Sequence, residues 1–102
     1  MIDKKMEEAL NKQVNAEMYS AYLYLAMAQY FESKNLPGCA SWMSAQSQEE
    51  MERGMKIVKY INERGGRVKL DKIDKPKGEW KGILDVFTDT LAHERKVTAS
   101  IY

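Results

Sequence analysis

With 102 residues, of which 44% are hydrophobic and 30% charged, the chain is long enough for one hydrophobic core, and its composition excludes a disordered protein. The net charge of +1 offers no electrostatic basis for binding nucleic acid or an anionic membrane, and we expect neither as a partner. The single cysteine, Cys39, excludes an intrachain disulfide framework, and the sequence shows neither a signal peptide nor a membrane-spanning stretch, so we expect a cytoplasmic protein.

Two breaks that contain proline separate the predicted helices. The first helix is expected at about residues 4 to 34, with Asp3 as its N-terminal cap. The second helix is expected at about residues 38 to 64, between Pro37 and the Gly65-Gly66 pair, which is suited to ending a helix.

Residues 65–81 are polar and basic, which predicts a loop, and a third helix is expected at about residues 83 to 102. A loop of about seventeen residues is long for a helical bundle, where about 2 to 8 residues is usual. We therefore expect an all-α fold in one domain, residues 1–102, whose long loop crosses the length of the bundle. The direction of the third helix stays open at this stage.

Each predicted helix carries one glutamate near the middle of an apolar stripe when residues are placed at about 100° per step. These residues are Glu17, Glu50 and Glu94. A lone glutamate on such a stripe commonly reaches water at the edge of the helix. In an antiparallel hairpin, however, Glu17 lies about level with residue 53 and within about one helical turn of Glu50. Three carboxylates at corresponding heights predict a cluster that a cation must neutralise.

The first helix has a second apolar face, nearly opposite the stripe that contains Glu17. It consists of Tyr19, Leu23, Ala26 and Tyr30. A helix that is apolar on two sides is buried on two sides. We expect another subunit to cover this second face, which predicts self-association into at least a dimer.

Carboxylates from facing helices, with a histidine three residues after one of them, form the di-iron sites of helical bundles. In this chain the second helix reads Glu50-x-x-Arg53 instead of Glu-x-x-His. The cation that neutralises the carboxylates is therefore either a bound metal or Arg53 itself.

The sequence resembles the ferritin family, specifically the non-haem ferritins of bacteria and archaea. The resemblance spans nearly the whole chain and rests on these stretches: NAEMYSAYLY at 15–24, ASWM at 40–43, AQSQEE at 45–50, YINERGGRV at 60–68, HE at 93–94 and SIY at 100–102.

This resemblance implies a ferritin-like bundle with a ferroxidase centre, which oxidises ferrous iron with dioxygen or peroxide inside a hollow shell that stores ferric mineral. Glu17 resembles the terminal ligand from the first helix, and Glu50 resembles the bridging ligand. Glu94 resembles the ligand from the third helix, and Tyr24 resembles the tyrosine packed beside the centre.

Two features depart from the family pattern. Arg53 occupies the position of the histidine ligand, and a guanidinium has no lone pair with which to bind iron. It can form an ion pair with Glu50 or Glu17, or it can turn to the helix edge near Trp42. The chain also stops within the family's third helix, so we expect a partner chain to complete the four-helix bundle.

Two functions therefore remain open. One is an iron-storage protein whose ferroxidase centre is impaired by Arg53, and the other is an inactive structural protein whose site is closed by a Glu-Arg ion pair. In the haem-carrying relatives a methionine at the position of Met51 binds haem, but we expect Met51 to serve in packing and expect no haem. We expect His93 to be a surface residue, because it lies about 100° from Glu94 around the helix.

Overall fold

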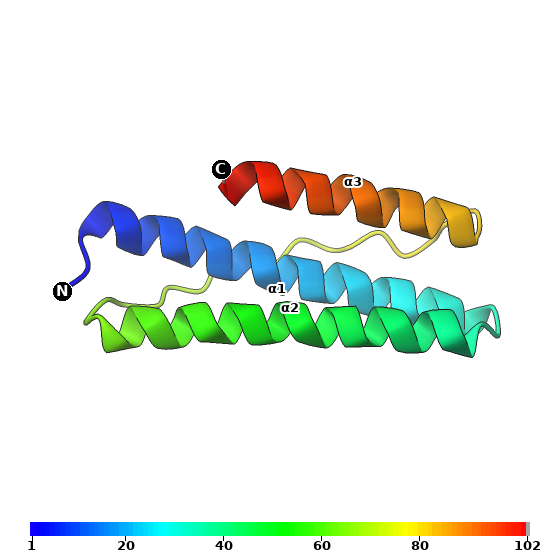
Figure 1. Ribbon diagram of the computed structural model, residues 1–102, viewed down its shortest axis with the longest axis horizontal. Coiled ribbons are helices and arrows are strands. Elements are labelled where there is room, and N and C mark those ends of the chain that lie inside the picture. The colour runs from blue at the N-terminus through cyan, green and yellow to red at the C-terminus, as the bar shows by residue number, and fades with distance from the viewer. Residues whose placement is uncertain (102) are drawn as a thin grey trace.

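The computed structural model describes residues 1–101, and it describes side chains as far as Thr98. Within this part the fold contains three helices and no strand: α1 spans Lys4–Ser33, α2 spans Pro37–Glu63 and α3 spans Ile83–Ile101 (Figure 1). The start of α1 is capped as predicted, because the Asp3 side chain accepts a hydrogen bond of 2.8 Å from the backbone N–H of Met6. The all-α fold with one long loop is confirmed.

Helices α1 and α2 form an antiparallel hairpin that supplies most of the packing (Figure 1). The turn between them uses Asn35, whose φ of 58° lies in the left-handed region that asparagine tolerates better than most residues. Pro37 opens α2 at a position where its missing N–H costs no helical hydrogen bond. Farther along, the Ser47 hydroxyl donates a 2.6 Å hydrogen bond to the Ala21 carbonyl and ties the two helices together.

The loop after α2 returns along the hairpin to the end where α2 began (Figure 1). Side chains of α1 hold its backbone there: the Asn11 amide donates to the Arg67 carbonyl at 3.0 Å and accepts from the Lys69 N–H at 2.7 Å, and Asn15 donates to the Lys72 carbonyl at 3.0 Å. The predicted crossover is thus confirmed. As a consequence α3 runs in the same direction as α2 and antiparallel to α1, which resolves the direction that the sequence left open.

The core lies mainly around the second half of α1, which is buried on two sides. Its buried members are Leu23, Tyr24, Met27, Ala28, Tyr30 and Phe31 from α1, Ala40 and Met43 from α2, Trp80 from the loop and Val86 from α3.

The cover of the second face of α1 differs from the prediction. The Tyr30 ring packs edge-on against Trp80, with 5.5 Å between ring centroids, and the Tyr19 ring lies 5.8 Å from the His93 ring. The expectation that another subunit covers this face is therefore wrong, because the crossover brings the chain's own loop and third helix onto it. Helical periodicity indicates that a face is buried without indicating what buries it.

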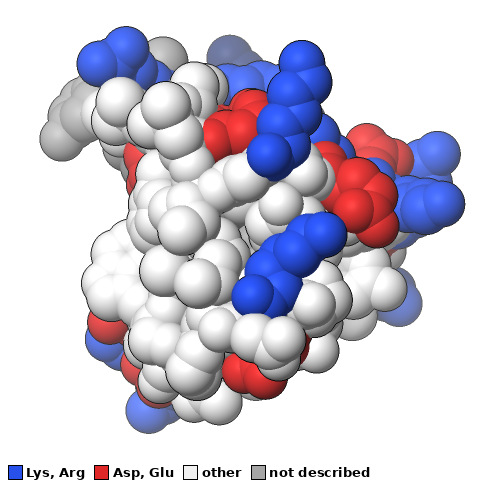
Figure 2. Space-filling view, turned by 90° about the vertical axis from the view of Figure 1, so that its right-hand side faces the viewer, with Lys and Arg blue, Asp and Glu red and all other residues white. Residues whose placement is uncertain are grey.

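The start of α3 is attached to the loop through one carboxylate. Asp89 accepts a 2.8 Å hydrogen bond from the Trp80 indole N–H and a 2.9 Å contact from the Lys77 ammonium group. These contacts hold the pKa of Asp89 below its ordinary value. Figure 2 views this end of the bundle: uncharged side chains cover much of the left and lower part of the view, positive and negative side chains gather mainly at the upper right, and one basic side chain lies near the middle.

Within the described residues, none of the helices combines the length and the apolar character that crossing a bilayer requires.

Candidate metal centre

Glu17 is buried at a place where α1 approaches α2 closely. Its side chain is 5% exposed, and a Cβ atom added at Gly54 would lie 3.5 Å from the Glu17 Cβ and 2.8 Å from the terminal methyl of Met18. This contact explains why a glycine stands inside the helix at position 54: the absence of a side chain lets α1 approach α2 at the level of the carboxylates. The sequence placed Glu17 level with residue 53, one residue away from this contact.

The two oxygens of the Glu17 carboxyl group have different surroundings. Oε1 accepts a 2.8 Å hydrogen bond from the side-chain amide of Gln13, one turn earlier on α1. Oε2 is buried and, among the described residues, meets no N–H or hydroxyl donor, although a protonated Glu50 carboxyl can share a hydrogen bond with Glu17. A buried polar atom without a partner is costly, so this oxygen is suited to receiving a cation or a proton.

Glu50 lies on α2 in the same interior and is 4% exposed. Burial and, after it, the neighbouring Glu17 carboxyl raise the pKa of Glu50 to about 8, although the Arg53 guanidinium opposes the rise. The Glu17 and Glu50 carboxyl groups are thus close enough to disfavour each other's charge. A divalent or trivalent cation between them would remove that penalty.

Arg53 contacts Glu50 from the rim of the site. Its Nη1 donates a 2.6 Å hydrogen bond to the Glu50 Oε1, and this ion pair raises the pKa of Arg53. The Arg53 side chain is nevertheless 57% exposed, whereas the Glu50 side chain is 5% exposed. The guanidinium therefore reaches in from solvent. Arg53 thus forms the ion pair with Glu50 while most of its side chain stays exposed, which combines the two orientations that the sequence left open.

Glu94 reaches the interior from α3 and accepts a hydrogen bond from the Tyr24 hydroxyl. Burial and this bond raise the pKa of Tyr24 well above its ordinary range. Glu94 also contributes to the raised pKa of Glu50, which indicates that the three carboxyl groups share one region of the fold. Tyr24 thus lies beside Glu94 and close enough to Glu50 for that carboxyl group to affect its pKa.

His93 is not the surface residue that the sequence predicted. Its ring is partly buried between Tyr19 and Tyr24, and its Nε2 lies 2.7 Å from the Ser20 hydroxyl. Burial lowers the pKa of His93. The angular argument from Glu94 failed because α3 packs on α1 through the flank that carries His93.

The described side chains, residues 1–98, contain no group of three or more His, Cys, Asp or Glu residues arranged as a metal site. The role of Glu17, Glu50 and Glu94 as metal ligands therefore stays a prediction. Their oxygen atoms are nonetheless the donors that hard cations such as ferric iron prefer. Sequence reasoning missed Gln13 and Ser20, although Gln13 precedes Glu17 by four residues, the spacing at which side chains on one helix face meet.

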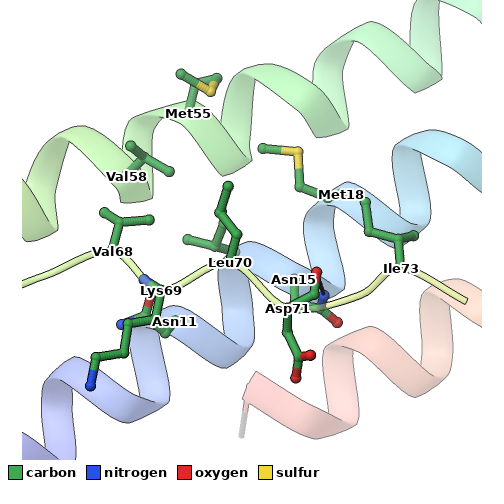
Figure 3. Close-up of a pocket in the computed structure, with 11 residues that line it drawn as sticks. Asn11, Asn15, Met18, Met55, Val58, Val68, Lys69, Leu70, Asp71 and Ile73 are labelled. Atoms are coloured by element: carbon green, nitrogen blue, oxygen red, sulfur yellow. Dashed lines mark hydrogen bonds between the residues drawn. The ribbon is translucent and has the colours of Figure 1, made fainter.

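A cavity of about 340 Å³, whose lining includes none of the three glutamates, lies between the crossover loop, α1 and α2 (Figure 3). Its apolar lining comes from Met18 and Val14 on α1, Met55 and Val58 on α2, and the loop residues Val68, Leu70 and Ile73. It opens on a surface where several large apolar side chains are exposed.

Comparison with known proteins identifies relatives along the whole chain. Residues 7–102 match the model of the Ferritin family, described as a ferritin-like domain. A bacterial non-haem ferritin from Bacteroides fragilis is 46% identical over 98 residues, covering 96% of this chain and 62% of the relative. A bacterial non-haem ferritin from Staphylococcus epidermidis is 43% identical over 102 residues, covering 100% of this chain and 61% of the relative.

Solved structures show the same fold. An Archaeoglobus fulgidus ferritin engineered into a closed form superposes with a TM-score of 0.97 at 50% identity, covering 99% of this chain and 62% of that one. An open-pore ferritin from the same archaeon gives a TM-score of 0.96 with the same identity and coverage. The chain spans about three fifths of the length of the curated relatives it matches.

Proposed function

Since this chain belongs to the ferritin family, we propose that it binds ferrous iron at Glu17, Glu50 and Glu94 and takes part in iron oxidation and storage. Iron is the substrate and cargo of this function. Each ferrous ion gives up one electron, and dioxygen or peroxide accepts it. Tyr24, hydrogen-bonded to Glu94, lies beside the proposed centre.

The observation that carries this proposal is a pair of buried carboxyl groups without a sufficient internal counter-charge. Within the described part of the chain a buried Glu17 oxygen meets no N–H or hydroxyl donor, and the pKa of Glu50 is raised to about 8 even with Arg53 in contact, so the two acids are neutralised by a shared proton instead of a cation. A purely structural ion pair at this place would be expected to hold Glu50 ionised and to satisfy both acids. The arrangement instead leaves capacity for a further cation.

Arg53 impairs the centre in this proposal without abolishing it. It occupies one Glu50 oxygen and repels an approaching cation, and it supplies no ligand in place of the family histidine. Because its side chain is 57% exposed, Arg53 can move away from Glu50 while remaining solvated. We therefore expect weak iron binding and slow oxidation.

The alternative is an inactive structural protein in which the Glu50–Arg53 pair keeps the site closed. The 2.6 Å contact between them favours this reading. The two readings differ in what the carboxylates do when ferrous iron is supplied.

The test is aerobic addition of ferrous iron to metal-free protein, followed by the appearance of ferric absorbance. The proposal expects oxidation faster than in buffer, and Arg53→His is expected to increase both iron affinity and rate. Arg64→His is the matched control, because Arg64 lies on the surface near the end of the same helix, over the Tyr60 ring. Oxidation no faster than in buffer, for both the parent protein and Arg53→His, would refute the proposed iron-oxidising activity.

We also propose that the chain self-associates through an exposed apolar surface, here called the Met51 face. It consists of Tyr22, Leu25, Met51, Met55, Leu70 and Ile73, whose exposed fractions lie between 42% and 78%. These residues line neighbouring hollows that share Leu25, Met51 and Ile73, so they form one surface around the cavity of Figure 3. Apolar surfaces of this kind are typical of protein interfaces.

A second group of exposed apolar side chains lies on α2 and α3. Trp42, 48% exposed, touches the ring of Phe87 on α3, with 5.7 Å between ring centroids. Tyr60, 43% exposed, lies on the same flank of α2, because it follows Trp42 by a whole number of helical turns. Leu91 on α3 is 54% exposed. We propose that a helix of another copy packs here and completes the bundle.

Light scattering coupled to gel filtration tests these contacts. Met51→Lys is expected to reduce the molar mass, whereas Met6→Lys is a matched control because Met6 is 51% exposed and lies outside the Met51 face. A monomeric parent protein would contradict self-association. We further propose a cytoplasmic location, which suits the free thiol of Cys39.

A further inference from the structure

Two neighbouring hydrogen bonds join α3 to α1 beside the carboxylates. The Tyr24 hydroxyl donates to Glu94, and the Ser20 hydroxyl lies 2.7 Å from the His93 Nε2. On α1 the two partners are four residues apart, about one helical turn, whereas on α3 they are consecutive. The two hydrogen bonds therefore hold α3 against α1 at two points that lie about one turn apart on α1.

The hydrogen positions of this contact follow from the surroundings of Ser20. Its hydroxyl lies 3.0 Å from the Ala16 carbonyl, which accepts its only hydrogen. We assign the Ser20 hydrogen to this carbonyl, so that the Ser20 oxygen accepts a hydrogen bond from a proton on the His93 Nε2. Ser20 is 2% exposed, and the His93 ring packs edge-on against Tyr24, with 5.9 Å between ring centroids. The bond is thus sheltered and directional.

The rest of the seam between α1 and α3 constrains the helix less. The Phe31 and Phe87 rings lie 5.9 Å apart, and the Thr90 hydroxyl, which is 2.9 Å from the Val86 carbonyl of its own helix, lies 3.3 Å from the Met27 sulfur. Ring packing and a weak bond to a thioether tolerate small rotations and translations of α3. Hydrogen bonds between buried groups lose energy steeply with misalignment, so they select one arrangement.

We propose that Ser20 and His93 are positioning residues, whose hydrogen bond sets the rotation and the axial position of α3 so that Glu94 is directed toward Tyr24 and the Glu17–Glu50 pair. His93 and Glu94 are adjacent and about 100° apart around the helix, so fixing one side chain fixes the direction of the other. This inference rests on the proposed function in one respect: Glu94 is taken to contact iron.

The first test observes the bond itself. The chain has one histidine, so protein labelled with ¹⁵N-histidine gives the two ring nitrogens of His93 alone. The parent protein is expected to show the Nε2–H form with a slowly exchanging proton, and Ser20→Ala is expected to lose this signature. Ser47→Ala is the matched control, because it removes a hydroxyl that joins α1 to α2 instead of α1 to α3.

The second test measures what the bond positions. Cobalt(II), titrated anaerobically into metal-free protein, reports the affinity of the carboxylates without oxidation. Loss of a residue that orients a metal ligand typically costs about 10- to 100-fold in affinity, so we expect Ser20→Ala and His93→Leu to weaken cobalt binding by at least about tenfold. His93→Gln, whose amide can donate from nearly the same place as Nε2, is expected to recover most of the loss.

The outcomes separate this inference from the proposed function. If the parent binds cobalt, then equal affinity in Ser20→Ala, or failure of His93→Gln to surpass His93→Leu, overturns the positioning role. If the parent binds no cobalt, the iron site fails, and the resonances of the Tyr24 ring decide instead. If the Ser20–His93 hydrogen bond positions Glu94, the Tyr24 ring resonances shift in Ser20→Ala and stay in place in Ser47→Ala. Unchanged resonances in Ser20→Ala overturn the positioning role.

Discussion

Replacing Arg53 by glutamine tests how the Glu50 carboxyl group is neutralised in the metal-free protein. The pKa of Glu50 is about 8 in the folded protein, against an ordinary value of 4.5 that applies to the unfolded chain. Between these values the folded protein keeps a proton that the unfolded chain has released. The free energy of unfolding therefore falls as the pH rises through this window, by up to about 1.4 kcal/mol per pH unit.

Arg53 changes this balance only where Glu50 is ionised. Above about pH 8 the parent protein has released the proton of Glu50, which then pairs with the guanidinium. Without the guanidinium, the pKa of Glu50 rises further and the loss of stability continues to higher pH. At about pH 9 we expect Arg53→Gln to be less stable than the parent by up to about 1.4 kcal/mol, and below about pH 7 by less than about 0.5 kcal/mol.

This magnitude is smaller than the roughly 3 to 5 kcal/mol expected when one partner of a fully buried pair is removed. The difference arises because the Arg53 side chain is 57% exposed and because Glu50 can take up a proton instead of remaining charged.

Urea denaturation followed by circular dichroism between about pH 5 and pH 9 measures the effect. Lys59→Gln is the control, since Lys59 pairs with Glu63 on the same helix and both side chains are exposed, so its effect should not grow with pH in this range. Glu50→Gln should flatten the profile of the parent protein. An Arg53→Gln effect of equal size at every pH would refute the reasoning, as would a loss of about 3 kcal/mol at acidic pH.

Three further outcomes follow from the packing. Gly54→Ala should change the free energy of unfolding by less than about 1 kcal/mol in thermal or urea unfolding, because the gain in helix propensity offsets the displacement of the flexible Met18 methyl, whereas Gly54→Leu should destabilise by about 1 to 3 kcal/mol. Trp80→Phe keeps an aromatic ring but leaves Asp89 without the indole N–H, so urea unfolding should show a loss of about 1 to 2 kcal/mol, and an unchanged midpoint would contradict the anchoring role. Tyr24→Phe should leave the phenolate absorbance titration near pH 10 unchanged, since the pKa of Tyr24 is raised far above the ordinary value of about 10, and a missing step there would show that Tyr24 ionises normally.

Much of the architecture was visible in the sequence because its signals are local. The capping residue Asp3, the break at Pro37 and the apolar periodicity place the helices, which the structure has at Lys4–Ser33, Pro37–Glu63 and Ile83–Ile101. The length of the loop indicated a crossover, since a chain of that length is not needed to join adjacent helix ends. The burial of Glu17 and Glu50 was likewise predicted from their places on the apolar stripes.

The partners of the buried faces were not predictable in the same way. Helical periodicity predicts another subunit over Tyr19 and Tyr30 and a surface position for His93, because it carries no information about which segment packs on a given face. Those contacts depend on the path of the loop and on the rotation of α3 about its axis. Both are set by contacts between residues far apart in the sequence, such as Asn11 with Lys69 and Ser20 with His93.

The position of Arg53 shows the same limit at the scale of a single side chain. Its angle of about 60° from Glu50 allowed it to point inward or outward. The orientation of Arg53 depends on two opposing free-energy costs: that of burying the guanidinium and that of leaving the Glu50 carboxylate without a counter-charge. The chain reaches a compromise, in which the guanidinium stays in solvent and extends one hydrogen bond inward to Glu50. The Glu50 carboxylate can therefore be neutralised by a proton, by the Arg53 guanidinium or, in the proposed function, by ferrous iron. A histidine in place of Arg53 would add a ligand for iron and so favour neutralisation by the metal, whereas the arginine favours neutralisation by an ion pair within the protein.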